Sequence, residues 1–492
     1  MKKISSIYLV LIVFIFSVVS CTKDISLEPE SLITVNSFWK TKEDALGGLY
    51  GMYNQFREEA RANLYYYGSA RSEIMGNGLQ NADFRIKYFE NSLSSSNADR
   101  DWLRLYRIVD YANLVIKFVP DISFPTESEK NNIIAQAYAM RAYVYFTMAK
   151  TWGDLPIVTD PVEGFDAEKT FVARSPVSQV FDLIKSDIET ALNLFLDNNL
   201  PDGKSVWSKP AVNTLKADVF LWTAKLMGGG DSDLNTALTA INNVESASLT
   251  LLDDFSSVFS YGNKGNDEII FAVHFRDLEV GNNYFGDMYI NALDLGAPNI
   301  PEDVKAKIPT AGGFNWWAPT ALVRDQFTID DQRKDASFLE IYQVANGDST
   351  FLTSVVLKAR GFGDAGVQKF LDDIVIYRYG ELLLMKAEVK NALGQDPTEE
   401  INQIRMRAYG DNFAAHQFVA STQTENDEAI LQERLFELIF EGKRWWDLVR
   451  FGKAFEKVPS LQGREADTYL LLWPITESTI SLNSKIQQNT GY

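Results

Sequence analysis

The 492-residue sequence is short of the residues that build disulfides and metal centres. It holds one cysteine, Cys21, and two histidines, His274 and His416. A single cysteine excludes an intramolecular disulfide, and two histidines so far apart lack the spacing of a histidine-based zinc site. The sequence also has no nucleophile elbow, Walker loop or dinucleotide fingerprint. We therefore predict that the chain is not an enzyme and has no catalytic residue, cofactor or metal site; a structural calcium on loop carboxylates stays open and unplaced.

Basic residues are also scarce, because 47 lysines and arginines stand against 66 acids and leave a net charge of −19. Nucleic acid binding needs a basic surface, so this balance argues against it. It argues equally against adhesion of the protein body to anionic lipid. Aromatic residues, in contrast, make up 13% of the chain, an excess that favours a protein that binds carbohydrate or peptide.

No apolar run reaches the length of a membrane span. The run at residues 7–19 is too short at ~1.5 Å per residue to cross a ~30 Å hydrocarbon core. Because Lys2 and Lys3 precede it, we interpret residues 1–20 as a secretory signal peptide. Val18-Val19-Ser20-Cys21 is similar to a bacterial lipoprotein processing box. We therefore predict that Cys21 is lipidated and anchors the chain to a membrane.

Cap residues and apolar spacing predict a mostly helical chain with an irregular middle. The expected caps include Thr126 with Glu129, Ser175 before Pro176, Ser208, and Thr424 with Asp427. Alanines recur among aromatic residues in several of the expected helices, as in tetratricopeptide-type hairpins, where small residues let helices approach closely. Between residues 250 and 369, Gly- and Asn-rich turns separate short apolar pieces, which predicts loops with strands at about 268–275 and 351–358. The helices are expected at 45–60, 97–118, 133–151, 177–196, 208–227, 231–244, 372–393, 397–408 and from 424 onward.

The stretch from Leu431 to Lys453 combines acids with arginines and two adjacent tryptophans. Its acids Glu433, Glu437 and Glu441 allow two interpretations. Two of them could act as the acid and base of a glycoside hydrolase, or all could be held by arginines as structural ion pairs. We favour the structural interpretation because each acid has a basic residue within one turn. Gly442 is expected to divide the stretch into two helices.

Five blocks, in order along the chain, resemble the SusD/RagB family. The predicted lipoprotein box and Trp102, Tyr106 and Asn113 are also similar to that family. Together the blocks are distributed along nearly the whole chain after residue 20. They are Ala137–Val158 (AYAMRAYVYFTMAKTWGDLPIV), Tyr377–Ala387 (YRYGELLLMKA), Ile401–Ala408 (INQIRMRA), Glu433–Gly452 (with EGKRWWDLVRFG) and Leu472–Tyr492 (with LWPI and QQNTGY).

The resemblance implies a fold, a place and a partner. The fold would be mostly α, with tetratricopeptide-like hairpins supporting a loop-rich ligand face with a few short strands. The chain would be an outer-membrane lipoprotein, lipid-anchored and facing the cell exterior, that passes a nutrient to a SusC-like TonB-dependent transporter. Its SusD-like domain would comprise residues 21–492, with an N-terminal helical part to about 249, a loop-rich part at about 250–370 and a C-terminal helical part at about 371–492.

The shared motifs are expected to build the scaffold, so the ligand site is sought in the variable loops. The scaffold residues would be Arg141, Gly153, Asp154, Glu441, Arg444, Asp447, Gln488 and Asn489. Sugar recognition needs exposed aromatic faces beside planar polar groups. Loop aromatics therefore give our ligand-binding candidates: Trp316, Trp317 and Asn315 in GGFNWW; Tyr65, Tyr66, Tyr67, Arg71 and Asn81; and Tyr284. For Trp317 an inward-packed position is the alternative, and at least one of the three tyrosines is expected to be exposed.

We expect a cell-surface protein that binds an oligosaccharide or polysaccharide and delivers it to a SusC-like transporter. Two alternatives stay open at this point. The same fold could bind a peptide or another nutrient, or two of the acids could hydrolyse a glycan at the surface. The sequence does not name the sugar.

Overall fold

The computed structural model describes residues 38–80, 82–164 and 166–492. The predicted signal peptide, Cys21 and the candidate ligand residue Asn81 lie outside these ranges. Thr41–Tyr492 form one compact unit. Within the described ranges, we find no helix that combines the length and the apolar character needed to span a membrane.

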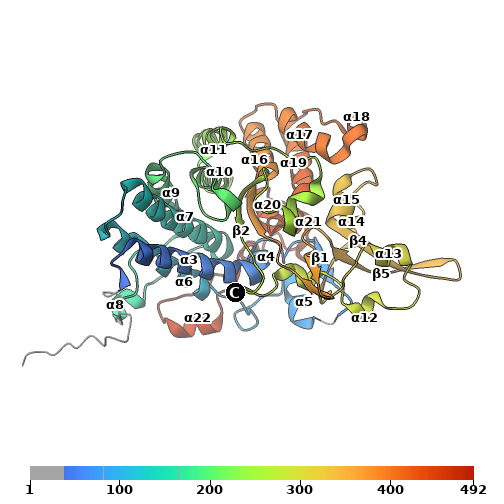
Figure 1. Cartoon of the computed structure of the whole chain (residues 1–492), viewed down its shortest axis with the longest axis horizontal. Coiled ribbons are helices and arrows are strands. Elements are labelled where there is room, and N and C mark those ends of the chain that lie inside the picture. The colour runs from blue at the N-terminus through green and yellow to red at the C-terminus, as the bar shows by residue number, and fades with distance from the viewer. Residues whose placement is uncertain (1–37, 81, 165) are drawn as a thin grey trace, which may run out of the picture. The chain divides into compact units, whose positions relative to one another are not determined.

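The first part of this unit is built mainly of helices (Figure 1). Two of its predicted caps are confirmed, because Thr126 accepts a hydrogen bond from the amide of Glu129 and Ser208 accepts one from that of Ala211. The elements are α3 (Lys42–Ala62), α4 (Leu64–Gly68), β1 (Met75–Asn77), α5 (Asp83–Phe89), α6 (Leu103–Phe118), η1 (Val119–Asp121), α7 (Glu127–Trp152), α8 (Ala167–Thr170), α9 (Val177–Leu194), η2 (Asp202–Lys204), α10 (Lys209–Leu226) and α11 (Gly230–Glu245).

One predicted cap and one predicted helix start are wrong, in each case because a different side chain binds the first amide of the helix, although α9 does begin at Val177 as predicted. The Ser175 side chain does not cap α9; the Asp154 carboxylate, from the loop after α7, accepts a hydrogen bond of 2.7 Å from the amide of Val177. Helix α6 starts later than predicted, at Leu103, whose amide donates to the Asp101 carboxylate. A tertiary cap such as that of Asp154 is invisible to spacing along the chain.

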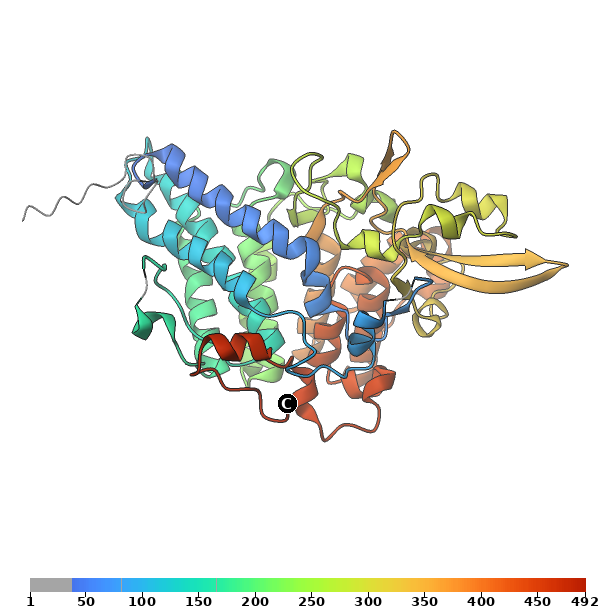
Figure 2. The same cartoon turned by 90° about the horizontal axis from the view of Figure 1, so that it is seen from below.

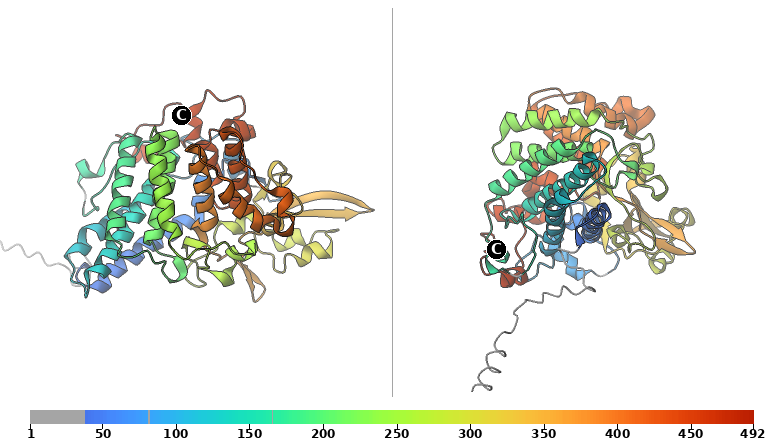
Figure 3. Two further views of the ribbon diagram at one scale, coloured as in Figure 1. Left: turned by 90° about the horizontal axis from the view of Figure 1, so that it is seen from above. Right: turned by 60° about the vertical axis from the view of Figure 1, so that its left-hand side comes forward.

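Neighbouring helices pack against one another in chain order: α3 on α6, α6 on α7, α7 on α9, and α10 on α11 (Figures 2 and 3). Helix α7 lies inside this array, because all but one of its side chains from Ile133 to Trp152 are buried. Ala135, Ala139 and Ala142 lie among them, and their small side chains allow close approach of the neighbours. The predicted mostly α fold with tetratricopeptide-like hairpins is confirmed.

The middle of the chain is made of short elements, as predicted. Its strands pair only in twos, as the antiparallel pairs β1–β3, β2–β8, β4–β5 and β6–β7. The β4–β5 hairpin projects away from the helices (Figures 1 and 2). The elements are η3 (Phe255–Phe259), η4 (Tyr261–Asn263), β2 (Ile269–Val273), η5 (Tyr284–Met288), α12 (Ala292–Leu295), α13 (Glu302–Ala306), β3 (Trp317–Pro319), α14 (Ala321–Arg324), α15 (Gln332–Ser337), β4 (Phe338–Ala345), β5 (Asp348–Val356), β6 (Phe362–Asp364) and β7 (Val367–Lys369).

Helices return in the last part of the chain, with two corrections to the prediction. The segment expected to be helical from residue 372 begins as strand β8, which pairs with β2, and Thr422 rather than Thr424 caps α19, in a capping box with Glu425. The elements are β8 (Ile374–Arg378), α16 (Tyr379–Ala392), α17 (Thr398–Tyr409), η6 (Gly410–Asn412), α18 (Phe413–His416), α19 (Gln423–Leu438), α20 (Arg444–Arg450), α21 (Ala454–Lys457), η7 (Pro459–Leu461), η8 (Thr468–Leu471) and α22 (Glu477–Leu482).

Gly442 divides the LQERLFELIFEGKRWWDLVRFGK stretch into α19 and α20, as predicted. Its φ of +74° lies in the left-handed region that favours glycine. Helix α4 packs against this corner so closely that a Cβ on Gly68 would lie 1.7 Å from the Gly442 carbonyl oxygen. The corner thus fixes the segment that leads from α3 into β1 and α5.

Candidate functional site

Three aromatic side chains, Phe84, Phe314 and Trp316, form a surface feature that we call the aromatic cluster. Phe84 and Phe314 are each 50% exposed, and Trp316 is half-buried. The rings of Phe314 and Trp316 stack with centroids 4.2 Å apart and an interplanar angle of 9°, and Phe84 meets Trp316 edge-on at 5.9 Å. Exposed aromatic groups of this kind mark interaction sites, since burying them against a partner removes apolar area from water.

The loop that carries Phe314 and Trp316 alternates between solvent and core. Phe314 and Trp316 reach the surface, whereas Asn315 and Trp317 are 0% and 1% exposed. The amides of Phe314 and Trp316 donate to the carbonyls of Gly286 and Asp287 at 2.9 and 2.8 Å. These bonds fix the loop on η5 and so hold both rings in place before any ligand arrives.

Asn315 pins the same loop from below. Its φ of +47° is a left-handed conformation that asparagine tolerates better than most residues. Its side-chain oxygen accepts from the Leu79 amide and the Thr353 hydroxyl, both at 2.9 Å, and its side-chain nitrogen donates to the Ser354 carbonyl at 3.1 Å. The amide side chain is therefore committed to the scaffold.

Arg85 supports the cluster from the protein side. Its guanidinium lies 4.2 Å from the centroid of the Phe84 ring and 4.3 Å from that of Trp316, and it pairs with Asp287 at 2.7 Å. Arg85 is only 3% exposed, so the two rings cover it. Burial raises the pKa of the Asp287 carboxyl, against the lowering effect of Arg85. A cation under the ring faces stabilises their orientation.

Polar side chains occur in the segments next to those that carry the aromatic cluster. The side chains of Gln80 and Asn291 both donate to the same carboxylate oxygen of Asp294, each at 2.6 Å. These bonds join the segment before α5 to the start of α12. Amide and carboxylate groups beside exposed rings are the combination that saccharides need, because their C–H faces pack on rings while their hydroxyls exchange hydrogen bonds.

Among the predicted ligand residues that the structure describes, Trp316 is the one that presents a ring at the surface. The expectation that at least one of Tyr65, Tyr66 and Tyr67 is exposed is wrong, because they are 1%, 3% and 0% exposed. They belong to helix α4, all of whose side chains are buried. Tyr65 and Tyr66 both pack edge-on against the buried ring of Trp317. Trp317 therefore takes the inward position that was its alternative.

The other described candidates also lie in the core. Arg71 is fully buried, donates to the carbonyl of Leu472 at 2.8 Å and to the Asn91 side chain at 2.7 Å, and covers the Trp445 ring. Tyr284, 6% exposed, packs on Tyr65 with ring centroids 5.1 Å apart. Like Asn315, these residues are buried in the scaffold.

Sequence reasoning missed Phe84 and left Phe314 out of the candidates. Phe314 stands inside the GGFNWW motif, and the alternation of an extended segment puts it on the same side as Trp316. Phe84 follows the polar Asn81-Ala82-Asp83 segment, but only the fold brings α5 beside the loop at residues 312–317.

The acids of the α19–α20 stretch are structural. Glu433 pairs with Arg333 at 2.6 Å and Arg405 at 2.8 Å, and Glu437 pairs with Arg333 and with Arg378, the latter at 2.6 Å. Burial alone would raise the pKa of Glu437, but the surrounding arginines outweigh it and hold that pKa far below the usual range. Glu441 pairs with Arg378 at 2.8 Å. Buried carboxylates that are held in ion pairs do not supply a general acid, so the structural interpretation is confirmed.

Several residues of the shared motifs have scaffold contacts, as expected. Arg141 binds Asp187 through two hydrogen bonds of 2.8 and 2.7 Å. Gln488 accepts from the Ile475 amide at 2.8 Å, and Asn489 donates to the carbonyls of Trp152 and Trp473. The terminal motif thus ties the end of the chain to α7.

The described histidines lie beside carboxylates. His274 lies 3.0 Å from an oxygen of Asp373, and His416 lies 2.6 Å from one of Asp330. In the part of the chain that the structure describes, no three His, Cys, Asp or Glu side chains gather as a metal site would require.

Comparison with known proteins identifies the family to which this helical scaffold belongs. The family model described as "SusD family" matches residues 363–492, and one described as "Starch-binding associating with outer membrane" matches residues 43–221. The solved structure of NanU from B. fragilis is 31% identical, superimposes with a TM-score of 0.82, and covers 95% of this chain and 100% of its own. The chain belongs to the SusD/RagB family.

Other SusD/RagB relatives agree with this assignment. A SusD-like protein, P38, of Formosa agariphila is 29% identical over the full length of both chains. A laminarin-binding SusD-like protein shares the fold at a TM-score of 0.72, with 20% identity, 92% of this chain and 100% of its own covered. Within this SusD/RagB chain, Phe84 lies in a segment that a family model matches, whereas Phe314 and Trp316 lie between the two matches.

Proposed function

We propose that this protein binds an oligosaccharide at the bacterial surface through the aromatic cluster. The observation that carries the proposal is the stacked, exposed pair Phe314–Trp316 with Phe84 at its edge, held rigid by Asn315 and Arg85. A preformed ring platform binds a sugar without an ordering cost at the site. The naming of one matching family as starch-binding, and of a protein with the same fold as laminarin-binding, supports a glycan as ligand.

The test is retardation of the lipid-free protein, starting at Thr22, in native gels that contain starch, laminarin or another neutral polysaccharide. We expect retardation by one class, and a roughly tenfold or greater loss of affinity when Trp316→Ala and Phe314→Ala remove the stacked pair. Phe351→Ala is the matched control, because Phe351 is 43% exposed and packs on Tyr342 instead. Equal loss in the control, or none in the double variant, would remove the aromatic cluster from the site.

We further propose that the bound glycan passes to a SusC-like TonB-dependent barrel in the outer membrane. The matching family described as associating with the outer membrane supports this location. Affinity purification of the tagged, lipidated chain from detergent-solubilised outer membranes should recover such a barrel, identified by mass spectrometry. Recovery of the chain without a barrel, under conditions that retain other membrane complexes, argues against delivery.

Binding without turnover separates this proposal from the hydrolase alternative. The acids that first suggested hydrolysis are consumed in buried ion pairs. Incubation with the polysaccharide that retards the protein should therefore release no new reducing ends. Release that disappears with a single carboxylate variant would establish an enzyme instead.

A further inference from the structure

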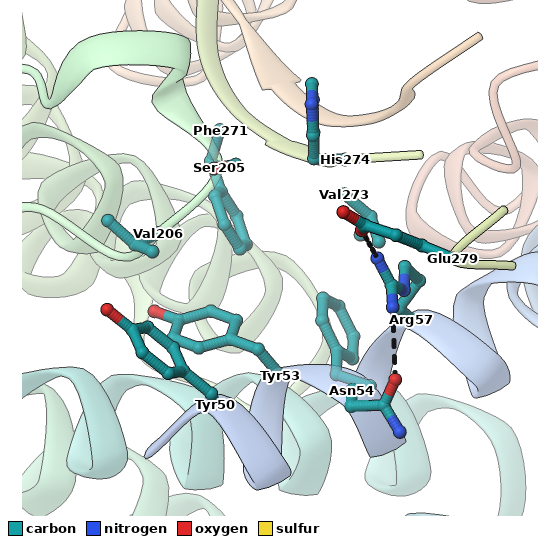
Figure 4. Close-up of a pocket in the computed structure, with 11 residues that line it drawn as sticks. Tyr50, Tyr53, Asn54, Arg57, Ser205, Val206, Phe271, Val273, His274 and Glu279 are labelled. Carbon is teal, nitrogen blue, oxygen red and sulfur yellow. Dashed lines mark hydrogen bonds and ion pairs between the residues drawn. The ribbon is translucent and has the colours of Figure 1, made fainter. Parts of the chain in front are cut away.

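A cavity of about 300 Å³ lies apart from the aromatic cluster, between helix α3 and strand β2 (Figure 4). Tyr50 and Tyr53 of α3 lie side by side on one wall, and the Phe271 ring of β2 faces them from the other. Ser205 and Val206 close one end. This volume is at the lower limit of typical small-ligand sites, so the cavity has room for a short saccharide.

The floor of the cavity is apolar and its aromatic wall is partly open. Phe56, Phe271 and Val273 are 1%, 0% and 5% exposed, whereas Tyr50 is 61% exposed. The Tyr53 hydroxyl is engaged elsewhere, since it donates to Gln136 and accepts from the Trp207 amide, both at 2.8 Å. Tyr53 therefore contributes only its ring to the cavity, and Tyr50 contributes a ring that no core contact covers completely.

The opposite end of the cavity is polar. Arg57 donates to the Glu279 carboxylate at 2.9 Å and to the Asn54 side chain at 3.1 Å, as Figure 4 shows. The Nε of Arg57 is buried and has no hydrogen-bond partner among the described residues. Donors and acceptors thus stand together, and the paired charges of Arg57 and Glu279 leave no net charge. Sugar hydroxyls both donate and accept, so this end suits a neutral saccharide better than an anion.

One run of chain joins this cavity to the aromatic cluster. Glu279 lines the cavity, the Asn282 carbonyl accepts from Arg61 of α3, and Asp287 holds Arg85 beneath Trp316. Asp287 follows Glu279 by eight positions, and at ~3.6 Å per residue this stretch of chain spans at most about 29 Å. Figure 1 shows α3, α4, β1 and α5 following one another across the unit, so the two features belong to one succession of elements.

We propose that the α3–β2 cavity is a second carbohydrate site, for a neutral saccharide, and that one glycan chain occupies it and the aromatic cluster together. The proposal rests on the proposed function for its ligand class. Tethering the second contact through the first makes it intramolecular, so affinity rises with chain length beyond the sum of single contacts.

Calorimetry with laminari- and malto-oligosaccharides of increasing length, and with the parent laminarin and starch, tests the proposal. Tyr50→Ala combined with Asn54→Ala removes two exposed groups, and we expect it to weaken binding of long chains by roughly tenfold or more while leaving short chains on the aromatic cluster unaffected. Tyr50→Phe is the matched control: it keeps the ring and should bind like the wild type. Long-chain affinity unchanged by the double variant overturns the proposal.

Crystals of the lipid-free protein soaked in maltose or laminaribiose give a second readout that does not depend on the aromatic cluster. Sugar density against Tyr50 and Phe271 supports the cavity site even if Trp316→Ala leaves binding unchanged, in which case only the proposed role of the cluster fails. Density in neither soak overturns the cavity site, whatever the gels show for the cluster.

Discussion

Arg378 stands at the centre of the buried charge network that holds the last third of the chain together. Its side chain is 0% exposed and lies 2.6–2.8 Å from the carboxylates of three glutamates. Glu268 directly precedes β2, whereas Glu437 and Glu441 belong to the α19–α20 corner. Burying a charge is costly unless it is paired, so the network stabilises the fold only while it is complete. At the residue scale, glutamates that could have suggested acid–base catalysis instead form ion pairs that join three chain segments.

Arg378→Met should reduce the free energy of unfolding by about 3–5 kcal/mol, because it leaves the carboxylates of Glu437 and Glu441 short of a buried partner. Urea unfolding followed by circular dichroism measures the change. Arg464→Met is the control, since Arg464 pairs with Asp467 at the surface, where the two side chains are 37% and 42% exposed, and such pairs contribute less than about 1 kcal/mol. A loss below about 1 kcal/mol for Arg378→Met would show that the network adds no stability.

Glu388 makes the fold sensitive to acid. Burial alone would raise its pKa, but Arg450 and Lys225 outweigh burial and lower the pKa from 4.5 to about 2. A depressed folded-state pKa contributes stability above pH 4.5, and this contribution is lost as the pH falls through 4.5 towards 2. The shift corresponds to stability on the order of 3 kcal/mol. The melting temperatures of the wild type and Glu388→Gln should therefore differ most at neutral pH, and the difference should become smaller on acidification. A constant difference in melting temperature from pH 6 to pH 2.5 would contradict this pH dependence.

At the scale of elements, the contact between α4 and the α19–α20 corner positions the aromatic cluster indirectly. Helix α4 presents Tyr65 and Tyr66 to Trp317, the buried neighbour of Trp316. The approach depends on Gly68, whose missing side chain admits the Gly442 carbonyl. Helix α4 therefore lies between the α19–α20 corner and the loop that carries the aromatic cluster.

Gly68→Ala should destabilise the protein by about 1–3 kcal/mol or more, because its Cβ would stand 1.7 Å from the backbone oxygen of Gly442. Thermal unfolding measures the loss, and glycan affinity should fall with it as the loop around Trp316 shifts. Gly262→Ala is the matched control, since a Cβ there meets nothing within 4 Å. Equal melting temperatures for the two variants would mean that α4 moves freely away from the corner.

Elements defined by local chemistry could be predicted from the sequence, and elements defined by distant partners could not. The caps at Thr126 and Ser208 act within four residues and were foreseen. Strand β8 was taken for helix because its apolar run leads directly into α16, and only pairing with β2 makes it a strand. The sequence predicts that at least one of the three tyrosines of α4 is exposed, and this fails for the same reason, because groups that cover them come from residues 284 and 317, far along the chain.

The candidate site also has parts that the local sequence predicts and parts that depend on distant residues. GGFNWW identified the loop that carries Trp316, but which of its side chains face outward depends on the hydrogen bonds of Asn315 to residues 79, 353 and 354. Phe84 and the α3–β2 cavity depend on contacts between segments about 200 residues apart, such as Arg57 with Glu279. No spacing rule along the chain relates residues at that distance.

At the scale of the whole molecule, we expect attachment to the membrane to depend on Cys21. A net charge of −19 opposes adsorption to anionic lipid, and Cys21 is the single thiol available for acylation. Acyl chains supply membrane affinity through burial of their methylene groups. We expect Cys21→Ser, expressed in a bacterium that processes lipoproteins, to move from the detergent-rich to the aqueous phase in a phase-partition assay and to lose labelling by radioactive palmitate. Its retardation by the polysaccharide should match that of the wild type, because the proposed glycan site lies entirely beyond residue 40. Retention of Cys21→Ser in the detergent phase would show that another part of the chain holds it at the membrane.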